Sequence, residues 1–254
     1  MINQKNNAVI IGAGVIGKAT GKALGINDFF DIRKGCGNLT QKEVYLFKYL
    51  FVCVPTPSTS SGCNLSYVEN VFKKFGKDHI YIIRSTVPPG TAEFLMKKYD
   101  CLVVNNPEFL TEKTANKDAK KPDIIVIGCN KKEVAKDIVK RFYSKKKFSK
   151  SELTITNNIT AEMIKYSINT FYATKVIFAN YLYQICRQKR IDYETVKKTM
   201  YKRKWIGNNH LTVPYENQFG VRGKCLPKDL IAFSKYSKSP FFLKMVKFMK
   251  EVND

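Results

Sequence analysis

Short apolar runs alternate with helical stretches along the first 156 residues of the chain. Such runs occupy residues 8–11, 29–32, 49–54, 79–84, 101–104, 123–128 and 152–156. A continuous apolar run of this length is typical of a strand buried on both faces, and strands that alternate with helices favour a parallel sheet with helices on both sides. The pattern therefore predicts an α/β fold, a Rossmann-type doubly wound parallel sheet.

The pattern changes at about residue 157. Residues 157–188 contain neither Gly nor Pro, and apolar side chains cover more than one face of the single long helix that they predict. A helix with so much apolar surface must be buried on several sides. We expect the rest of its own domain and a second subunit to cover it, so the chain is predicted to form a homodimer through this helix.

The remainder of the chain also has a helical pattern. The sequence predicts a helix over 192–204, a loop over 205–224 and a pair of helices over 227–251 that is interrupted by a proline. The chain is therefore expected to consist of two domains, an α/β domain of residues 1–156 and an all-helical domain of residues 157–254.

The composition limits the classes of function. The formal charge is +23, but only seven of the 44 basic residues are arginine, and the lysines are spread in small groups. Such a surface attracts anionic substrates, but it lacks the continuous basic patch that is typical of nucleic-acid binding. Nucleic acid is therefore not expected as a main partner. Seven cysteines without a CxxC pair indicate neither a disulfide framework nor a zinc site, and no metal is expected. No apolar run reaches the about 18 residues of a membrane span, and no signal peptide precedes the first strand, so we expect a cytoplasmic protein.

A glycine-rich turn follows the first strand. In GAGVIG, residues 12–17, Gly12 would form the tight turn, Gly14 would let a pyrophosphate approach the backbone, and Gly17 would let the helix pack on the strand. Asp31 lies 19 residues after Gly12, where the carboxylate that binds an adenosine ribose is expected, so the motif predicts NAD.

Two alternatives apply to this motif. GAGVIGK also fits the opening of a phosphate-binding P-loop, but Ala19 stands where Mg²⁺ would need a Ser or Thr hydroxyl. Arg33 could accommodate the 2′-phosphate of NADP, whereas Asp31 favours NAD.

Proline-containing loops follow three of the predicted strands. They are VPTP at 54–57, STVPPG at 85–90 and NNPEFLTE at 105–112. Each could be an ordinary proline-stiffened turn, but ligands of such sheets bind beyond the carboxyl ends of the strands, where all three loops are expected. The residues predicted to bind the cofactor are Gly12, Gly14, Val15, Ile16, Gly17, Asp31, Arg33, Val54, Pro55, Thr56, Ser85 and Thr86.

A cysteine stands between two lysines in FGVRGKCLPKD, residues 219–229. Pro227 suits the first position of a helix, so Cys225 is expected just before a helix N-terminus, where the positive end of the dipole and the flanking lysines favour the thiolate. A structural cysteine is the alternative. Lys165 and Asn169 lie four residues apart and share a face of the long helix, either as a solvated pair or as part of a site.

Seven segments follow one another in chain order: GAGVIG, VCVPTP, RSTVPPGT, NPEFLTE, AEMIKYSINTFYA, IGNNHLTVP and GKCLPKD. Together they resemble the signatures of the UDP-glucose dehydrogenase family, whose members oxidise nucleotide sugars to uronic acids. The most specific are NPEFLTE, the KxxxN helix and CLPKD. The resemblance extends over nearly the whole chain.

The resemblance implies roles for individual residues. Cys225 would be the nucleophile, Lys165 and Asn169 would stabilise oxyanions, Asp229 would organise a water molecule, and Thr86 and Glu112 would contact that water. Glu108 matches the other glutamate of the family. The residues implied to bind a UDP-hexose, most naturally UDP-glucose, are Glu108, Phe109, Leu110, Lys165, Asn169, Phe219, Gly220, Arg222, Gly223 and Lys228.

The chemistry agrees with these residue types. Oxidation of a primary alcohol to a carboxylate removes four electrons, so two hydrides pass to NAD with an aldehyde between the steps. A cysteine thiolate can hold that aldehyde as a thiohemiacetal and then as a thioester, which water cleaves. Each tetrahedral species carries an oxyanion that a lysine and an asparagine can stabilise.

The sequence also departs from the family pattern. The family ordinarily has a second nucleotide-binding-like domain that grips UDP, whereas this sequence stops at Asp254, as expected of a short form. Arg222 stands where the family usually has glycine. Two alternatives stay open: a single-step dehydrogenase of the hydroxy-acid type, which uses a KxxxN helix without a cysteine, and an inactive relative that acts as a binding protein.

Overall fold

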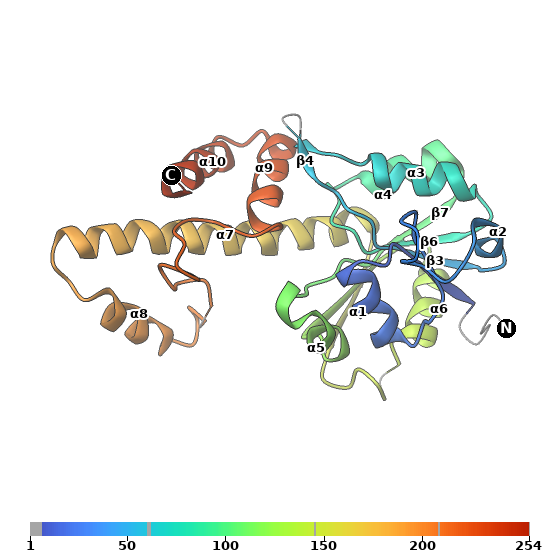
Figure 1. Ribbon diagram of the computed structural model, residues 1–254, viewed down its shortest axis with the longest axis horizontal. Coiled ribbons are helices and arrows are strands. Elements are labelled where there is room, and N and C mark those ends of the chain that lie inside the picture. The colour runs from blue at the N-terminus through green and yellow to red at the C-terminus, as the bar shows by residue number, and fades with distance from the viewer. Residues whose placement is uncertain (1–6, 60–61, 145, 208, 254) are drawn as a thin grey trace. The chain divides into compact units, whose positions relative to one another are not determined.

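The computed structural model describes residues 7–59, 62–144, 146–207 and 209–253. The chain divides into two compact units. The first comprises Met1–Thr56 and Asn64–Lys165, and the second comprises Pro57–Cys63 and Tyr166–Asp254 (Figure 1). One long helix therefore starts in the first unit and continues in the second.

The first unit is built on a seven-stranded sheet. Every apolar run of the sequence overlaps one of its strands, which are β1 (Ala8–Ile11), β2 (Phe29–Phe30), β3 (Tyr49–Val52), β6 (Ile80–Ile83), β7 (Leu102–Asn105), β8 (Ile124–Gly128) and β9 (Glu152–Thr156). The strand order is β2-β1-β3-β6-β7-β8-β9. The predicted Rossmann-like sheet is confirmed.

The direction of the last two strands differs from the prediction of a fully parallel sheet. β8 meets β7 in antiparallel orientation through Asn105 and Gly128, and β9 is parallel to β8. A parallel connection needs a crossover long enough to return the chain to the starting edge of the sheet. The helix between β7 and β8, α5 (Ala115–Lys120), is only about 9 Å long. The chain therefore enters β8 from the opposite end.

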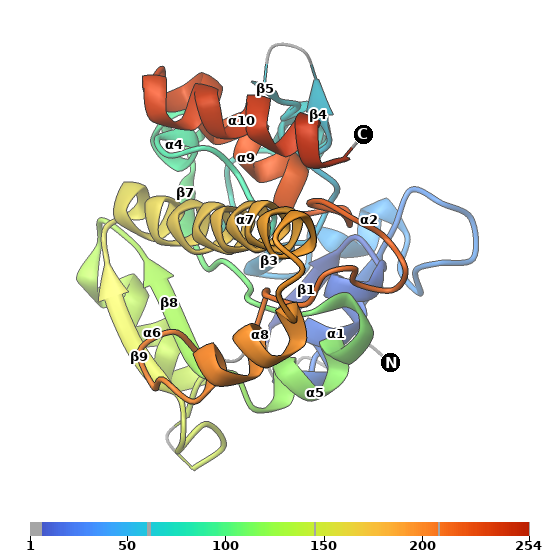
Figure 2. The ribbon, with the colours of Figure 1, turned by 90° about the vertical axis from the view of Figure 1, so that its left-hand side faces the viewer.

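Helices cover both faces of the sheet. Successive strand residues point to opposite sides, and in these strands both sets of side chains are apolar. Val9, Leu50 and Ile83 belong to one apolar cluster, and Ile10 and Phe51 belong to the other. The first face is covered by α2 (Gln41–Val44), α3 (Ser66–Phe75) and α4 (Thr91–Tyr99), and the second by α1 (Val15–Leu24) and α6 (Lys132–Phe142). Helices α1 and α5 lie side by side through a cluster of alanines (Figures 1 and 2), and a short 3-10 helix, η1 (Glu112–Thr114), precedes α5.

The second unit is mainly helical. Its elements are the hairpin strands β4 (Ser58–Thr59) and β5 (Gly62–Cys63), the greater part of α7 (Asn158–Gln188), α8 (Tyr193–Tyr201), α9 (Leu226–Ser237) and α10 (Pro240–Asn253). The hairpin, α9 and α10 lie together in Figures 1 and 2. The predicted long helix, the short helix after it and the final helical pair are confirmed. Within the described residues, no helix is long and apolar enough to cross a membrane.

Gly128 lets the start of α7 approach the end of β8. A Cβ atom at residue 128 would lie 2.5 Å from Ala161 Cβ and 2.9 Å from the Asn157 carbonyl oxygen. Overpacking of this kind costs about 1–3 kcal/mol. We expect Gly128→Ala to lower the free energy of unfolding by about that amount in urea denaturation.

Gly14→Ala is the matched control for this measurement. A Cβ atom at Gly14 would meet no atom within 4 Å, and its φ of −76° is open to any residue. We expect its unfolding free energy to stay within about 0.5 kcal/mol of the wild type. Equal losses in the two variants would contradict a steric role for Gly128.

Candidate active site

The glycine-rich turn has the geometry of a dinucleotide cradle. Gly12 has a φ of +101°, and a Cβ atom there would lie 2.5 Å from the Cys53 carbonyl oxygen. A Cβ atom at Gly17 would lie 1.9 Å from the Gly12 carbonyl oxygen, so both positions require glycine. Gly14 borders open space and caps the N-terminus of α1. The open position at the start of a helix fits a diphosphate, as the NAD hypothesis requires.

The acid at the end of β2 is tied to this turn. Asp31 Oδ2 accepts the Ala13 N–H at 2.8 Å, and Arg33 donates two side-chain hydrogen bonds to the same carboxylate, at 2.9 and 2.7 Å. These bonds, chiefly those from Arg33, hold the pKa of Asp31 well below its usual range. Asp31 therefore stays ionised, and it orients an arginine that is itself largely exposed.

The loops after β3 and β6 are bonded to each other. The buried Ser85 hydroxyl donates to the Val54 carbonyl at 2.7 Å, and the Thr56 hydroxyl donates to the Thr86 carbonyl at 2.8 Å. Pro55 is exposed, and Thr86 is half-buried. These two hydrogen bonds join the loops, and the first of them lies next to the glycine-rich turn, since a Cβ atom at Gly12 would meet Cys53 and Val54.

Glu108, in the loop after β7, forms a buried charged pair with Lys165 of α7. Lys165 Nζ lies 3.6 Å from Glu108 Oε1 and 5.1 Å from the centre of the Phe109 ring. Both charged side chains are almost completely buried. Glu108 also accepts the Leu110 N–H at 2.6 Å, so its carboxylate is held by its own loop. Lys165 and Glu108 were predicted separately, and the structure brings them into contact.

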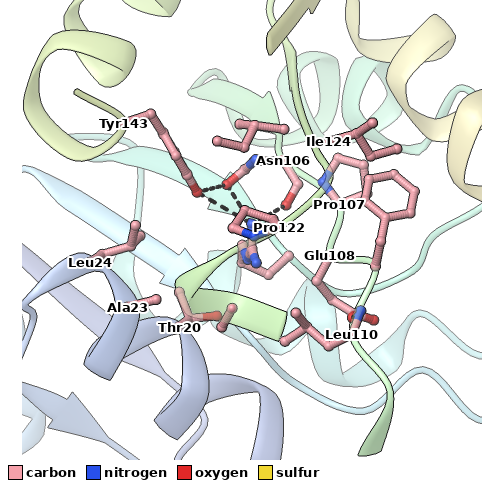
Figure 3. A pocket seen from close by; sticks show the side chains of 14 residues that line it. Thr20, Ala23, Leu24, Asn106, Pro107, Glu108, Leu110, Pro122, Ile124 and Tyr143 are labelled. Atoms are coloured by element: carbon pink, nitrogen blue, oxygen red, sulfur yellow. Dashed lines mark hydrogen bonds between the residues drawn. The ribbon is translucent and has the colours of Figure 1, made fainter. Parts of the chain in front are cut away.

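Asn106, at the start of the loop after β7, is the centre of a buried polar network that the sequence did not predict. Asn106 Oδ1 accepts a hydrogen bond from the Tyr143 hydroxyl (Figure 3). It also accepts one from Arg84 Nη1 at 2.8 Å, while Asn106 Nδ2 donates to the Val126 carbonyl. The three side chains are buried. Arg84 and Asn106 are the first residues of the RSTVPPG and NPEFLTE segments, and nothing local in either segment indicates that their side chains meet.

The cavity beside this network is too small for a substrate. Its lining includes Thr20 from α1 and Pro107, Glu108 and Leu110 from the loop (Figure 3). Its volume of about 30 Å³ leaves room for roughly two water molecules. The cavity therefore does not serve as the substrate site.

In the second unit, an aspartate joins two of the predicted residues. Asn169 Nδ2 donates to Asp229 Oδ2 at 2.6 Å, and Lys228 Nζ is bonded to Asp229 Oδ1. Asp229 is fully buried, in the first turn of α9. Both carboxylate oxygens are therefore engaged, one by an amide and one by an ammonium group.

Cys225 is the N-cap residue of α9, as its position before a helix start predicted. Pro227 occupies the second helical position and not the first. The reason is that α9 begins at Leu226, and the second position also lacks an intrahelical N–H partner. The thiol stands four residues before the buried Asp229.

Exposure distinguishes this cysteine from the others. Burial raises the pKa of Cys53 to about 12 and that of Cys101 to about 11, and it raises the pKa of Cys129 as well. Those thiols are unsuited to attack a carbonyl group. Of the cysteines in the described part of the chain, Cys225 alone is exposed.

The loop before Cys225 is fastened to the end of α10. A Cβ atom at Gly220 would lie 2.1 Å from Asn253 Oδ1, and Asn253 accepts the Val221 N–H and donates to the Val221 carbonyl. Arg222 donates to the carbonyls of Phe219 and Asn253. Gly220 and Arg222, predicted as substrate contacts, therefore also have structural roles. Within the IGNNHLTVP segment, Asn208 lies outside the described residues.

The predicted catalytic residues thus fall into two sets. The first unit contains Thr86, Glu112 and Lys165, and the second contains Asn169, Cys225 and Asp229. Lys165 and Asn169 share one face of α7 through their spacing. Glu112, at the start of η1, is exposed.

Two family models match consecutive parts of the chain. Residues 36–147 match the NAD binding domain of the UDP-glucose/GDP-mannose dehydrogenase family, and residues 159–254 match the central domain of the same family. The chain belongs to this family. Residues 36–147 match the NAD binding domain of this family, and a dinucleotide cradle precedes them, so the cofactor is NAD.

Individual relatives agree with this assignment. The chain is 37% identical to a UDP-glucose 6-dehydrogenase of Rickettsia bellii over 202 residues, which are 76% of this chain and 45% of the relative. It is 32% identical to a GDP-mannose 6-dehydrogenase of Pseudomonas aeruginosa over 237 residues, 86% of this chain and 50% of the relative. The chain thus spans about half the length of these family members.

A solved structure has the same fold. A UDP-glucose dehydrogenase from Pyrobaculum islandicum superposes with a TM-score of 0.83 at 25% identity, over 97% of this chain and 67% of that chain. The likeness therefore includes the sheet, the long helix and the helices that follow.

Proposed function

We propose that the chain catalyses the NAD-dependent oxidation of UDP-glucose, or a related UDP-hexose, to the uronic acid. The observation that carries the proposal is the exposed Cys225 at the N-cap of α9, one helical turn from a buried Asp229 that is bonded to Asn169. Among the alternatives, a single-step dehydrogenase has no use for such a thiol. The relatives named for nucleotide-sugar oxidation support the same assignment.

The residues have distinct roles in the proposed reaction. When bound, NAD would supply the hydride acceptor, and the two oxidations would use two NAD molecules in succession. The Cys225 thiolate adds to the C6 aldehyde and forms a thiohemiacetal, which becomes a thioester when its C–H is oxidised. Water then adds to the thioester, the C–S bond breaks, and the thiol and the uronic acid are released.

Oxyanions form in the thiohemiacetal and in the hydrolysis step. Lys165 and Asn169 would donate hydrogen bonds to them from one face of α7. Asp229 would organise the hydrolytic water, with Thr86 and Glu112 as further contacts. The buried Glu108 holds the Lys165 ammonium group in place.

The domains and the remaining contacts are assigned accordingly. Residues 1–156 would bind NAD, and residues 157–254 would supply the nucleophile and the dimer contact. The hexose would contact Phe109, Leu110 and Lys228. Its diphosphate would be held by the basic Arg222 and Lys224 together with a neighbouring subunit.

NAD reduction with a panel of nucleotide sugars is the experiment that tests the proposed function. The panel includes UDP-glucose, UDP-galactose, UDP-N-acetylmannosamine and GDP-mannose, and NADH is followed by its absorbance. We expect turnover with a UDP-hexose and two NADH per sugar. Binding of sugar and NAD without any turnover would favour the inactive relative, and one NADH per sugar would favour the single-step dehydrogenase.

The proposed homodimer would use a stripe on α7. Phe171, Phe178 and Ile185 are spaced by seven residues on one face of this helix, and their exposed fractions are 61%, 52% and 51%. A two-fold interface uses each of these residues twice. Burial of a large apolar side chain stabilises by about 1.5–3 kcal/mol, so loss of both copies of one residue weakens the dimer by about 10²–10⁴-fold.

Phe178→Asp should therefore be a monomer at a protein concentration where the wild type is a dimer. Multi-angle light scattering over a dilution series measures the difference. Phe94→Asp is the control, since Phe94 is 47% exposed on α4 and lies outside this stripe. A monomeric wild type, or a dimer that tolerates Phe178→Asp, would contradict this interface.

A further inference from the structure

Glu162 is a buried acid on α7, one helical turn before Lys165. Only 1% of its surface is exposed. Its Oε2 accepts the Gly90 N–H at 2.6 Å, and its Oε1 accepts the Ala92 N–H at 2.8 Å. The carboxyl group therefore joins α7 to the start of α4.

Helix α4 depends on this acid for its N-terminal cap. The N-cap residue is Gly90, whose φ is +92° and which has no side chain with which to cap the helix. The first backbone N–H groups of a helix have no intrahelical acceptor. The two oxygens of Glu162 accept hydrogen bonds at this helix end from a different helix.

The capped residues end the loop that contains Thr86. At its start, Ser85 is bonded to the Val54 carbonyl, and the Thr86 carbonyl accepts from Thr56. At its end, Gly90 is bonded to Glu162. The loop of residues 85–90 is thus fixed at both ends, and its second anchor is on the helix that carries Lys165.

Asn158, in the first turn of α7, makes a similar connection to β7. Its Oδ1 accepts the Asn105 N–H at 2.9 Å, and its Nδ2 donates to the Val103 carbonyl at 3.1 Å. The loop that contains Glu108 begins directly after Asn105. The start of α7 is therefore bonded to both loops that carry predicted site residues of the first unit.

We propose that Glu162 is a positioning residue that binds the end of the 85–90 loop to α7 and so keeps Thr86 in register with Lys165. The proposal rests on the function proposed above, because it assigns Glu162 an effect on that reaction. Glu162 itself does not contact substrate or cofactor in this account. It acts through the backbone amides of Gly90 and Ala92.

The pH dependence of stability provides one signature of this acid. Burial raises the pKa of Glu162 to about 8, and Glu93 on α4 acts in the same direction, against the hydrogen bonds from Ala92 and Gly90. The unfolded chain loses this proton near the ordinary value of 4.5, whereas the native chain keeps it. The contribution of Glu162 to stability is therefore full below about pH 4.5 and is lost as the pH rises to about 8.

The test compares Glu162→Gln and Glu162→Asp with the control Glu93→Gln. Glu93 lies in the first turn of α4, so the control removes a carboxylate from the same helix without removing the cap. Hydrogen exchange is measured at the amides of Gly90 and Ala92. Steady-state NADH formation gives kcat and the KM for NAD, and urea denaturation between pH 5 and 8 gives the slope of stability against pH.

For Glu162→Gln, we expect amide protection at Gly90 and Ala92 to fall by about tenfold or more, since one acceptor oxygen becomes an NH₂ group. We expect kcat to fall by about tenfold with the KM for NAD within about threefold, because the glycine cradle is not involved. The slope of stability against pH should flatten. Glu162→Asp should lie between wild type and Glu162→Gln, and Glu93→Gln should match the wild type in exchange and kcat.

Unchanged protection at Gly90 and Ala92 would overturn the proposal. A normal kcat despite lost protection would also overturn it, because Glu162 would then cap α4 without positioning the site. A wild type that forms no NADH with any sugar would refute the proposed function, and the exchange data would still show whether Glu162 holds the loop.

Discussion

Cys225→Ala should abolish the second oxidation and leave the chain unable to release uronic acid at a useful rate. The wild type is expected to form two NADH for each sugar consumed. In the variant, the aldehyde has no thiolate to attack, and no other group in CLPKD can form a thioester. We expect the rate of acid formation to fall by several orders of magnitude, with at most one NADH per sugar.

The ratio of NADH to sugar at completion is the deciding measurement, together with mass spectrometry of protein that is quenched during turnover. The wild type should carry a covalent adduct on the peptide that contains Cys225. Cys36→Ala is the control, because it removes a half-buried thiol of the first unit and should leave the ratio at two. One NADH per sugar from a wild type with unmodified Cys225 would identify a single-step dehydrogenase.

The sequence predicted the regular part of the fold well, because the signals for it are local. Apolar runs define buried strands, and the glycine spacing defines the turn after β1. The direction of β8 was missed, since it depends on the length and path of the connection through α5 and not on the pattern within β8 itself.

The candidate site was predicted as separate motifs, and its internal contacts were not. Nothing local in NPEFLTE indicates that Glu108 pairs with Lys165, which lies 57 residues later in the chain. The same is true of the bond between Asn169 and Asp229. Such contacts arise from tertiary packing, so only the residue types could be proposed in advance.

The supporting residues were missed for a related reason. Glu162 stands in AEMIKYSIN like an ordinary helical glutamate, and only its burial and its bonds to Gly90 and Ala92 distinguish it. A local signal for it does exist. Gly90 precedes α4 without a capping side chain, and a helix start without a cap needs an acceptor from elsewhere.

Lys165→Ala should slow both oxidations by about 10²–10³-fold, the usual effect of removing one oxyanion donor. Unlike Cys225→Ala, it leaves the nucleophile in place. The product should therefore still be the acid, and the ratio of NADH to sugar should still be two. Rapid-quench measurements of each step, with the aldehyde supplied for the second, would separate the two effects.

The structure adds a second consequence of this substitution. Lys165 forms an ion pair with the buried Glu108, so alanine leaves that carboxylate with the Leu110 N–H and without the ammonium group. Removing one partner of a buried pair destabilises by about 3–5 kcal/mol, so the unfolding free energy must be measured alongside the rates.

Lys197→Ala is the control that separates lost stability from lost catalysis. Lys197 on α8 is also buried and is paired with Glu194 at 2.7 Å, but it belongs to none of the predicted site segments. It should lower stability and leave kcat within about threefold of the wild type. If Lys165→Ala retained wild-type rates for both oxidations while folded, the oxyanion role of Lys165 would be refuted, and its contact with Glu108 would be structural alone.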